Sequence, residues 1–195
     1  MKKLSFILAV IMILTSLLAF SACSKDKGGD ENKGIEPGDA DIHAMVAAIE
    51  EKQPYGDYVS EILYKEDDPD EMIKWTYGFV DINANELLSD YVITMHSDYC
   101  NTLAILKFED GMTEDDFAEV KEVITDEYIE SRASSLQMYM PEEYKKMNWA
   151  LENPDKIWRQ YGDDLLVLAI IGSEESTPVW EAIDGYLAGG EAEAE

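Results

Sequence analysis

The sequence predicts an α+β fold in which helices pack on an antiparallel sheet of about four strands. Tyr91 to Met95 and Leu103 to Phe108 are rich in β-branched and aliphatic residues, a pattern typical of a strand hairpin. An amphipathic pattern follows this hairpin and predicts a long helix. A second hairpin with its own helix is predicted further along the chain. The predicted order is therefore β-β-α-β-β-α, with extra helices on the N-terminal side.

Two helices are predicted before the first hairpin. Apolar residues recur with the spacing of one helix face at Ile42, Met45, Val46 and Ile49. Asp39 or Asp41 is expected to cap this helix at its N-terminus. A shorter helix is expected from Asp70 to Tyr77, because Pro69 precedes it and Gly78 stops it.

The long helix after the first hairpin is expected to begin after Thr113, with acidic residues in its positively polarised first turn. Its predicted inner face comprises Phe117, Val120, Ile124 and Tyr128. Pro141 is expected to begin a further helix, which Asn153-Pro154 closes. The residues of that helix predicted to point inward are Tyr144, Met147 and Leu151.

The second hairpin is predicted to run from Ile157 to Tyr161, through a Gly162-Asp163-Asp164 turn, to Leu165–Ile171. Its last strand is apolar throughout, which is typical of a central strand covered on both faces. Ser176 is expected to cap the final helix. That helix carries Trp180, Ile183 and Leu187.

Two segments of the chain have similar hydrophobic patterns. Leu103 to Ile124 lies over Leu166 to Leu187 without a gap, at an offset of 63 residues. The identity is too low to show a duplication. A hairpin followed by a capped amphipathic helix could produce the same pattern without common descent.

The first 22 residues have the layout of an export signal. Lys2 and Lys3 precede an apolar run, and Phe20-Ser21-Ala22-Cys23 matches a lipobox, although Phe20 stands where Leu is usual. We therefore predict cleavage before Cys23 and attachment of diacylglycerol, with fatty acids such as palmitate, to its thiol. The alternative is an uncleaved membrane helix.

The lipid on Cys23 is expected to hold the mature chain at the outer face of the cell membrane. Two or three acyl chains suffice, since each buried methylene contributes about 0.8 kcal/mol. Residues 23–40 are polar and glycine-rich, and predict a flexible tether. Residues 41–188 are expected to form a single domain, and 189–195 an acidic tail.

The charge of the chain excludes one class of partner. The 15 basic and 42 acidic residues give a net charge of −27. Loss of residues 1–22 removes two lysines and no acid, so the mature chain carries −29. Such a protein repels phosphate backbones, so no nucleic acid is expected to bind. Cations or basic peptides are partners that the charge admits, and solubility alone is the other interpretation.

No chemical motif predicts a catalytic residue, a metal ligand or a cofactor. With Cys23 acylated, Cys100 is a lone thiol and no intramolecular disulfide can form. His43 and His96 lack a neighbouring serine elbow, and are more typical of satisfied or exposed histidines. Acidic residues are dense in 66–71 and 109–116, but neither run has EF-hand spacing. Both runs are more typical of helix N-termini and solubilising charge.

An aromatic cluster precedes the first hairpin. Its members are Tyr55, Tyr58, Tyr64, Trp75, Tyr77 and Phe79. Such a cluster could stack on a sugar or grip a peptide, and the candidate ligand-binding residues are Tyr58, Tyr64, Trp75 and Tyr77. The alternative is structural, an N-terminal arm laid over the sheet.

This layout resembles a family of uncharacterised lipoproteins from Gram-positive bacteria, the domain of unknown function 4358 family. The resemblance rests on Tyr77-Gly78 after a short acidic helix, the strand Asn101 to Phe108, the long helix ending near Arg132, the Tyr139-Met140-Pro141 step and the closing hairpin. It implies a lipid-anchored extracytoplasmic protein. It implies no activity and no functional residue.

The leading functional expectation is a non-enzymatic binding module at the cell surface, with an extracellular protein or ligand as its unknown partner. One alternative is an extracytoplasmic hydrolase or cell-wall enzyme, with its site in the aromatic segment or beside His96. A weaker alternative is calcium-dependent binding through the acidic runs.

Overall fold

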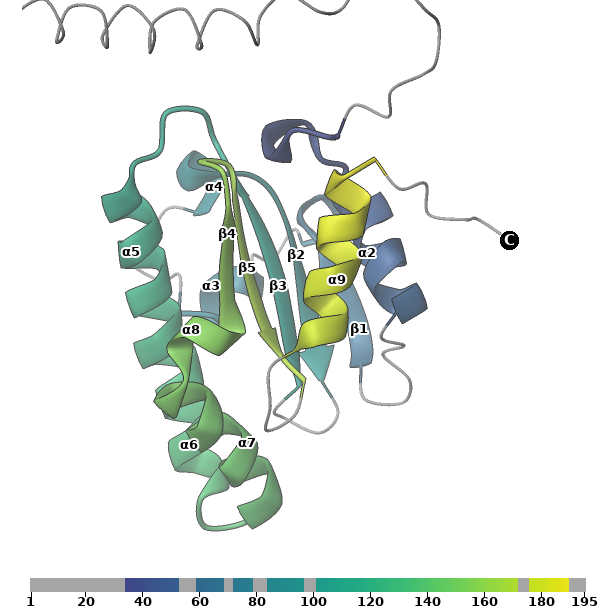
Figure 1. Cartoon of the computed structure of the whole chain (residues 1–195). Helices are drawn as coiled ribbons and strands as arrows, with labels where there is room; N and C mark the ends of the chain where they lie inside the picture. Colours follow the sequence, from purple (N-terminus) through teal and green to yellow (C-terminus); the bar gives the residue numbers. More distant parts are fainter. Residues whose placement is uncertain are drawn as a thin grey trace, which may run out of the picture. The chain divides into compact units, whose positions relative to one another are not determined.

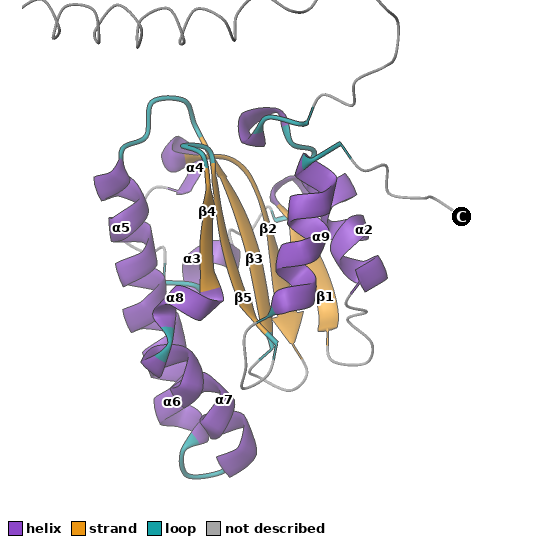
Figure 2. Ribbon diagram, viewed as in Figure 1, coloured by secondary structure: helices purple, strands orange, loops and turns teal. Residues whose placement is uncertain are grey.

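The computed structural model of the chain describes residues 34–52, 59–68, 72–78, 84–96, 101–171 and 176–189. They form a five-stranded antiparallel sheet with helices packed on both faces (Figures 1 and 2). The predicted α+β class is confirmed. Cys23, the predicted signal peptide, Cys100 and residues 190–195 of the predicted acidic tail lie outside the described residues.

The strand order in the sheet is β1-β2-β3-β5-β4. The strands are β1 Val59–Tyr64, β2 Leu88–His96, β3 Thr102–Phe108, β4 Trp158–Tyr161 and β5 Leu165–Ile170. The expectation of about four strands therefore missed β1. Among the strands that the structure describes, this edge strand pairs with β2 alone, and its register is irregular between Val59 and Glu61. Its consecutive apolar residues do not alternate, so its sequence lacks the period-two pattern by which strands are recognised.

The helices have the following bounds. They are η1 Pro37–Asp39, α2 Ile42–Lys52, η3 Lys65–Asp67, α3 Met72–Thr76, α4 Ala84–Leu87, α5 Glu114–Val123, the π-helix η4 Ile124–Glu130, α6 Ser131–Leu136, α7 Pro141–Glu152, α8 Pro154–Ile157 and α9 Thr177–Leu187. The helices predicted to begin near Ile42, Glu114, Pro141 and Thr177 are confirmed. The short helix expected behind Pro69 is confirmed as α3, and Gly78 follows it with a positive φ of 80°.

Two hydrophobic cores lie on opposite faces of the sheet. α2 and α9 cover one face, which we call the α2–α9 face. α3, α5, η4, α6 and α7 pack on the other, which we call the α5–α7 face. Along β5, Leu165, Val167 and Ala169 belong to the first core, and Leu166, Leu168 and Ile170 to the second. All six side chains are buried, so the prediction of a central strand covered on both faces is confirmed.

The two halves of the domain are not related by a rotation. β3 and β5 are antiparallel neighbours, and the strands that precede them, β2 and β4, lie on their outer sides. A two-fold axis normal to the sheet would place both following helices on one face. Instead α5 packs on the α5–α7 face and α9 on the α2–α9 face. The similarity between the two segments therefore reflects a shared hairpin-and-helix pattern and not a symmetric repeat.

The folded domain begins before the predicted boundary at residue 41. The Ile35 N–H donates to the Leu187 carbonyl at 2.7 Å, and the Lys107 Nζ donates to the Ala40 carbonyl at 3.1 Å. Residues 37–39 form η1. The predicted tether of residues 23–40 is thus too long at its C-terminal end. The polar composition there is typical of a linker, but hydrogen bonds from one backbone and one side-chain donor attach the segment to the domain.

The helix caps agree with the sequence in two of three cases. Thr113 and Asp116 form a capping box on α5. The Asp41 Oδ1 accepts the first N–H groups of α2. Ser176 occupies the N-cap position of α9 without capping it through its side chain, because its hydroxyl lies 3.3 Å from the Ala169 carbonyl and donates there.

The π-helix η4 shifts the inward face of the long helical segment by one residue. Before it, the buried residues of α5 follow ordinary helical spacing, as predicted. Within η4, Ile124, Tyr128 and Ile129 are all buried, and in α6 the buried residues are Ala133 and Leu136. A π-turn holds one residue more than an α-turn, so every later residue is displaced by one position around the helix axis. Ile129 and Ala133 therefore face the core, whereas a regular helix would direct Arg132 there.

Candidate functional site

A groove with a volume of about 510 Å³ lies between the α5–η4 segment and the start of β4. Its lining residues are Lys121, Glu122, Thr125, Asp126, Pro154, Asp155 and Trp158. The first four come from the last turn of α5 and the first residues of η4, and the others from α8 and β4. The groove therefore joins two segments that are distant in the chain.

The α8 wall is built by a single helical turn. Pro154 opens α8, and the Trp158 N–H closes it by donating to the Pro154 carbonyl. Trp158 then begins β4, and its side chain enters the core of the α5–α7 face with 8% of its surface exposed. The turn thus leaves Asp155 exposed beside a mostly buried indole.

The opposite wall contains the junction between α5 and η4. Thr125 and Asp126 belong to the π-helix, whose other side carries the buried residues Ile124, Tyr128 and Ile129. A π-turn is wider than an α-turn and is frequently found at functional sites. Here it sets the spacing between the core-facing and groove-facing residues of one wall.

The electrostatics of the groove are dominated by three exposed carboxylates, those of Glu122, Asp126 and Asp155. Lys121 adds one ammonium group. Within the described ranges, the side chains of these three acids make no hydrogen bond or ion pair. The described residues that line the groove therefore carry more negative than positive charge.

The sequence-predicted aromatic residues do not form one patch. Tyr64, at the end of β1, packs against the α2–α9 core, whereas Tyr77 is fully buried in the core of the opposite face. Trp75 lies on α3 with 68% of its surface exposed. Tyr58 lies outside the described residues. Tyr77 is thus a core residue that no ligand reaches, because none of its surface is exposed. The sheet separates it from Tyr64, although the two residues are close in sequence.

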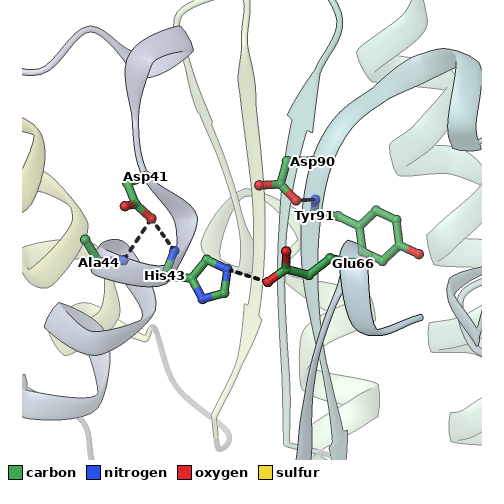
Figure 3. Close-up of polar contacts among 6 residues, drawn as sticks. All are labelled: Asp41, His43, Ala44, Glu66, Asp90 and Tyr91. Atoms are coloured by element: carbon green, nitrogen blue, oxygen red, sulfur yellow. Dashed lines mark hydrogen bonds and ion pairs between the residues drawn. The ribbon is translucent and has the colours of Figure 1, made fainter. Parts of the chain in front are cut away.

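His43 and Tyr64 form a contact between α2 and the end of β1. Their rings stack with centroids 3.8 Å apart. The His43 Nε2 lies 3.6 Å from the Glu66 Oε1, while Asp41 caps the helix beside it (Figure 3). Partial burial raises the pKa of Tyr64, and the negative charge of Glu50 adds to this effect. This arrangement links elements of the fold, and the side chain of His96 lies outside the described residues.

The acidic runs contribute helix caps. The buried Asp68 accepts the N–H groups of Met72 and Ile73, at the N-terminus of α3. Asp116 closes the capping box with Thr113, and these hydrogen bonds lower the pKa of the Asp116 carboxyl. The interpretation of these acids as helix N-terminal residues is confirmed. Among the described residues, no group of three or more histidine, cysteine or acidic side chains could hold a metal ion.

The buried tyrosines predict a loss of stability at alkaline pH. Burial, and then the neighbouring Tyr128, raise the pKa of Tyr77 well above its usual value, so the folded state favours its neutral form. A tyrosine whose pKa is higher in the folded than in the unfolded state adds stability that is fully present below the unfolded-state pKa of about 10. This stability is lost as the pH rises from there through the folded-state pKa. We expect the free energy of unfolding to fall above about pH 10 in urea titrations.

The matched variants for this pH prediction are Tyr77→Phe and Tyr139→Phe. Tyr77→Phe should reduce the alkaline decline without abolishing it, because burial and the Asp184 charge also raise the pKa of Tyr161 to about 12. Tyr139, with 79% of its surface exposed, provides the control. Equal declines in the two variants would contradict the prediction.

Sequence reasoning missed the groove. Its only sequence signal is the apolar pair Tyr128-Ile129, where the spacing of inward residues shifts by one. No helix in the described ranges is long and apolar enough to cross a membrane. Comparisons with models of known families, with curated proteins and with solved structures found no match to this chain. The resemblance to the domain of unknown function 4358 family stays a prediction.

Proposed function

We propose that the protein is a lipid-anchored, extracytoplasmic binding module that takes a ligand into the groove between α5–η4 and α8–β4. The observation that carries this proposal is the groove itself, which is lined by three carboxylates, without a partner among the described residues, and by the mostly buried Trp158. Ligand sites are concave, with an apolar lining and a few placed polar groups. The lipid on Cys23 would hold this groove at the outer face of the cell membrane.

Binding in the groove is testable by chemical-shift mapping on the lipidated mature chain in detergent micelles. The probes are lysine amide, N-acetylglucosamine and glutamate at millimolar concentration, a range suited to weak fragments. We expect at least one probe to shift amides in 121–126 and 154–158. Thr125→Trp should block the groove and remove these shifts, whereas Ala118→Trp, on the exposed side of α5, should preserve them. Groove amides that stay unmoved by all three probes would refute the site.

The anchor predicts a specific effect of Cys23→Ala. This variant should lose incorporation of an alkyne-palmitate label and accumulate as the unprocessed precursor, while the thermal unfolding of its domain, followed by circular dichroism, stays unchanged. The reason is that the thiol accepts diacylglycerol before cleavage, so a chain without this thiol keeps residues 1–22. Cys100→Ala, the matched control, should keep the label. A label that persists in Cys23→Ala would contradict the proposal.

A further inference from the structure

We infer that the groove binds the charged side chain of a lysine or arginine in a basic peptide. This inference rests on the proposed function and names the ligand class of the same site. Three features of the groove support it: the placement of the carboxylates, the apolar lining beside them and the position of Lys121.

The carboxylates lie on both walls of the groove. Glu122 and Asp126 are four residues apart along the α5–η4 wall, and Asp155 is on the α8 wall. An ammonium or guanidinium group between the walls would therefore meet negative charge from two sides. Hydrogen bonds from such cations to carboxylates are stronger than bonds between neutral groups. Because these acids have no partner among the described residues, binding would break no ion pair of that part of the chain.

The apolar part of the lining suits the stem of the same side chain. Pro154 and Trp158 line the groove beside the acids. Lysine and arginine bury their methylene stems along apolar surface and keep the charged head among polar groups. Methylenes and a cation thus match the two kinds of surface that the groove offers.

Other ligand classes match the groove less well. An anion would be repelled by three carboxylates. A sugar needs a flat exposed ring for stacking, and Trp158 exposes only 8% of its surface. A divalent cation needs several converging oxygen ligands, and within the described ranges no such group of side chains occurs.

Neutralising Lys121 should change the affinity for a cation in the opposite direction to neutralising the acids. Its ammonium lines the groove and carries the same charge as the inferred ligand. It therefore opposes an incoming cation, as like charges at close range do. Lys121→Gln keeps a polar side chain of similar length and removes this repulsion. The inference accordingly predicts weaker binding when the acids are neutralised and tighter binding when Lys121 is neutralised.

The experiment is calorimetric titration of the lipidated mature chain in neutral detergent micelles with an N-acetylated tetralysine peptide. The groove variant is Glu122→Gln/Asp126→Asn/Asp155→Asn. The control variant is Glu50→Gln/Glu51→Gln/Glu181→Gln, which makes the same change in net charge at exposed positions of α2 and α9. The control removes the effect of total charge, which is large because the mature chain, without Lys2 and Lys3, carries −29.

The expected result is a loss of affinity of about tenfold or more in the groove variant and of less than about threefold in the control, since surface charges act mainly at short range. Lys121→Gln should raise affinity by roughly threefold. A tetralysine peptide acetylated on every side chain should bind at least about tenfold more weakly than its charged parent. Each effect should shrink as salt is added.

Equal losses in the groove and control variants would overturn the inference, because binding would then follow net charge alone. Equal binding of the acetylated peptide would overturn it as well. If another probe still shifts the groove amides, the proposed function survives this failure. If no probe shifts them, both proposals fail. Should the groove variant not fold, as judged by its melting curve, a weaker affinity of Lys121→Gln would still refute the inference.

Discussion

Gly78→Ala is expected to lower the free energy of unfolding by about 2–4 kcal/mol, from backbone strain and a steric clash together. Gly78 has a φ of 80°, in the left-handed region that residues with a side chain rarely adopt. A Cβ built there would clash with the Glu127 Cβ and would lie 2.9 Å from its Cγ. The close approach places the end of α3 directly against η4, so either the turn or the π-helix must move.

Alanine substitutions at two other glycines distinguish backbone strain from the steric clash as causes of the lost stability. Gly111 has a φ of 91°, and a Cβ at this residue would meet nothing within 4 Å, so Gly111→Ala should cost only the backbone term, about 1–2 kcal/mol. Gly185 lies within α9 with open space around it, so Gly185→Ala should stabilise the protein by up to about 1 kcal/mol. Urea unfolding measures all three. Equal losses for Gly78→Ala and Gly111→Ala would rule out the clash.

Asp68→Ala is expected to cost about 2–4 kcal/mol, because it leaves several buried donors unpaired. The Asp68 carboxylate is 5% exposed and accepts the Met72 N–H at 2.6 Å and the Ile73 N–H at 3.2 Å. It also accepts the Tyr91 hydroxyl at 2.8 Å. The same side chain therefore caps α3 and ties it to β2. Its loss should loosen the α3 packing on the α5–α7 face.

A double-mutant cycle tests this role. Asp67, its exposed neighbour in sequence, provides the control, and Asp67→Ala should change stability by less than about 0.5 kcal/mol. Tyr91→Phe removes the tyrosine donor, so adding it to Asp68→Ala should cost less than it does in the wild-type background. Strict additivity of the two substitutions in urea unfolding would show that the pair does not interact energetically.

Local patterns in the sequence predicted most elements because their causes lie within a few residues. The helix face of Ile42 to Ile49 is buried as its spacing predicts, and the Thr113 cap forms with the side chain three residues away. The apolar β5 strand is central and buried on both sides. Ser176 occupies its predicted position, yet its hydroxyl bonds to β5, because a partner across the fold competes with the local one.

The positions of the candidate aromatic residues could not be predicted from local sequence patterns. Tyr64 ends β1 and packs on the α2–α9 face, whereas Tyr77 follows α3 and packs on the opposite face, so the sheet lies between two side chains that are close in sequence. Pairing of β1 with β2 depends on residues about 30 positions apart, which no local pattern contains. Trp158 likewise becomes part of a groove only when α8 packs near η4.

By itself, the sequence determined the acidic charge, the helix faces, most of the caps and the central strands, and it predicts the export signal and anchor. These properties follow from composition, periodicity and hydrogen bonds of short reach. Only the tertiary structure decided that α5 and α9 cover opposite faces, that Tyr77 is core, and that the acids of η4 and α8 face one groove. Those outcomes depend on which distant strands pair and which face each helix covers, and the folded chain settles both through long-range packing.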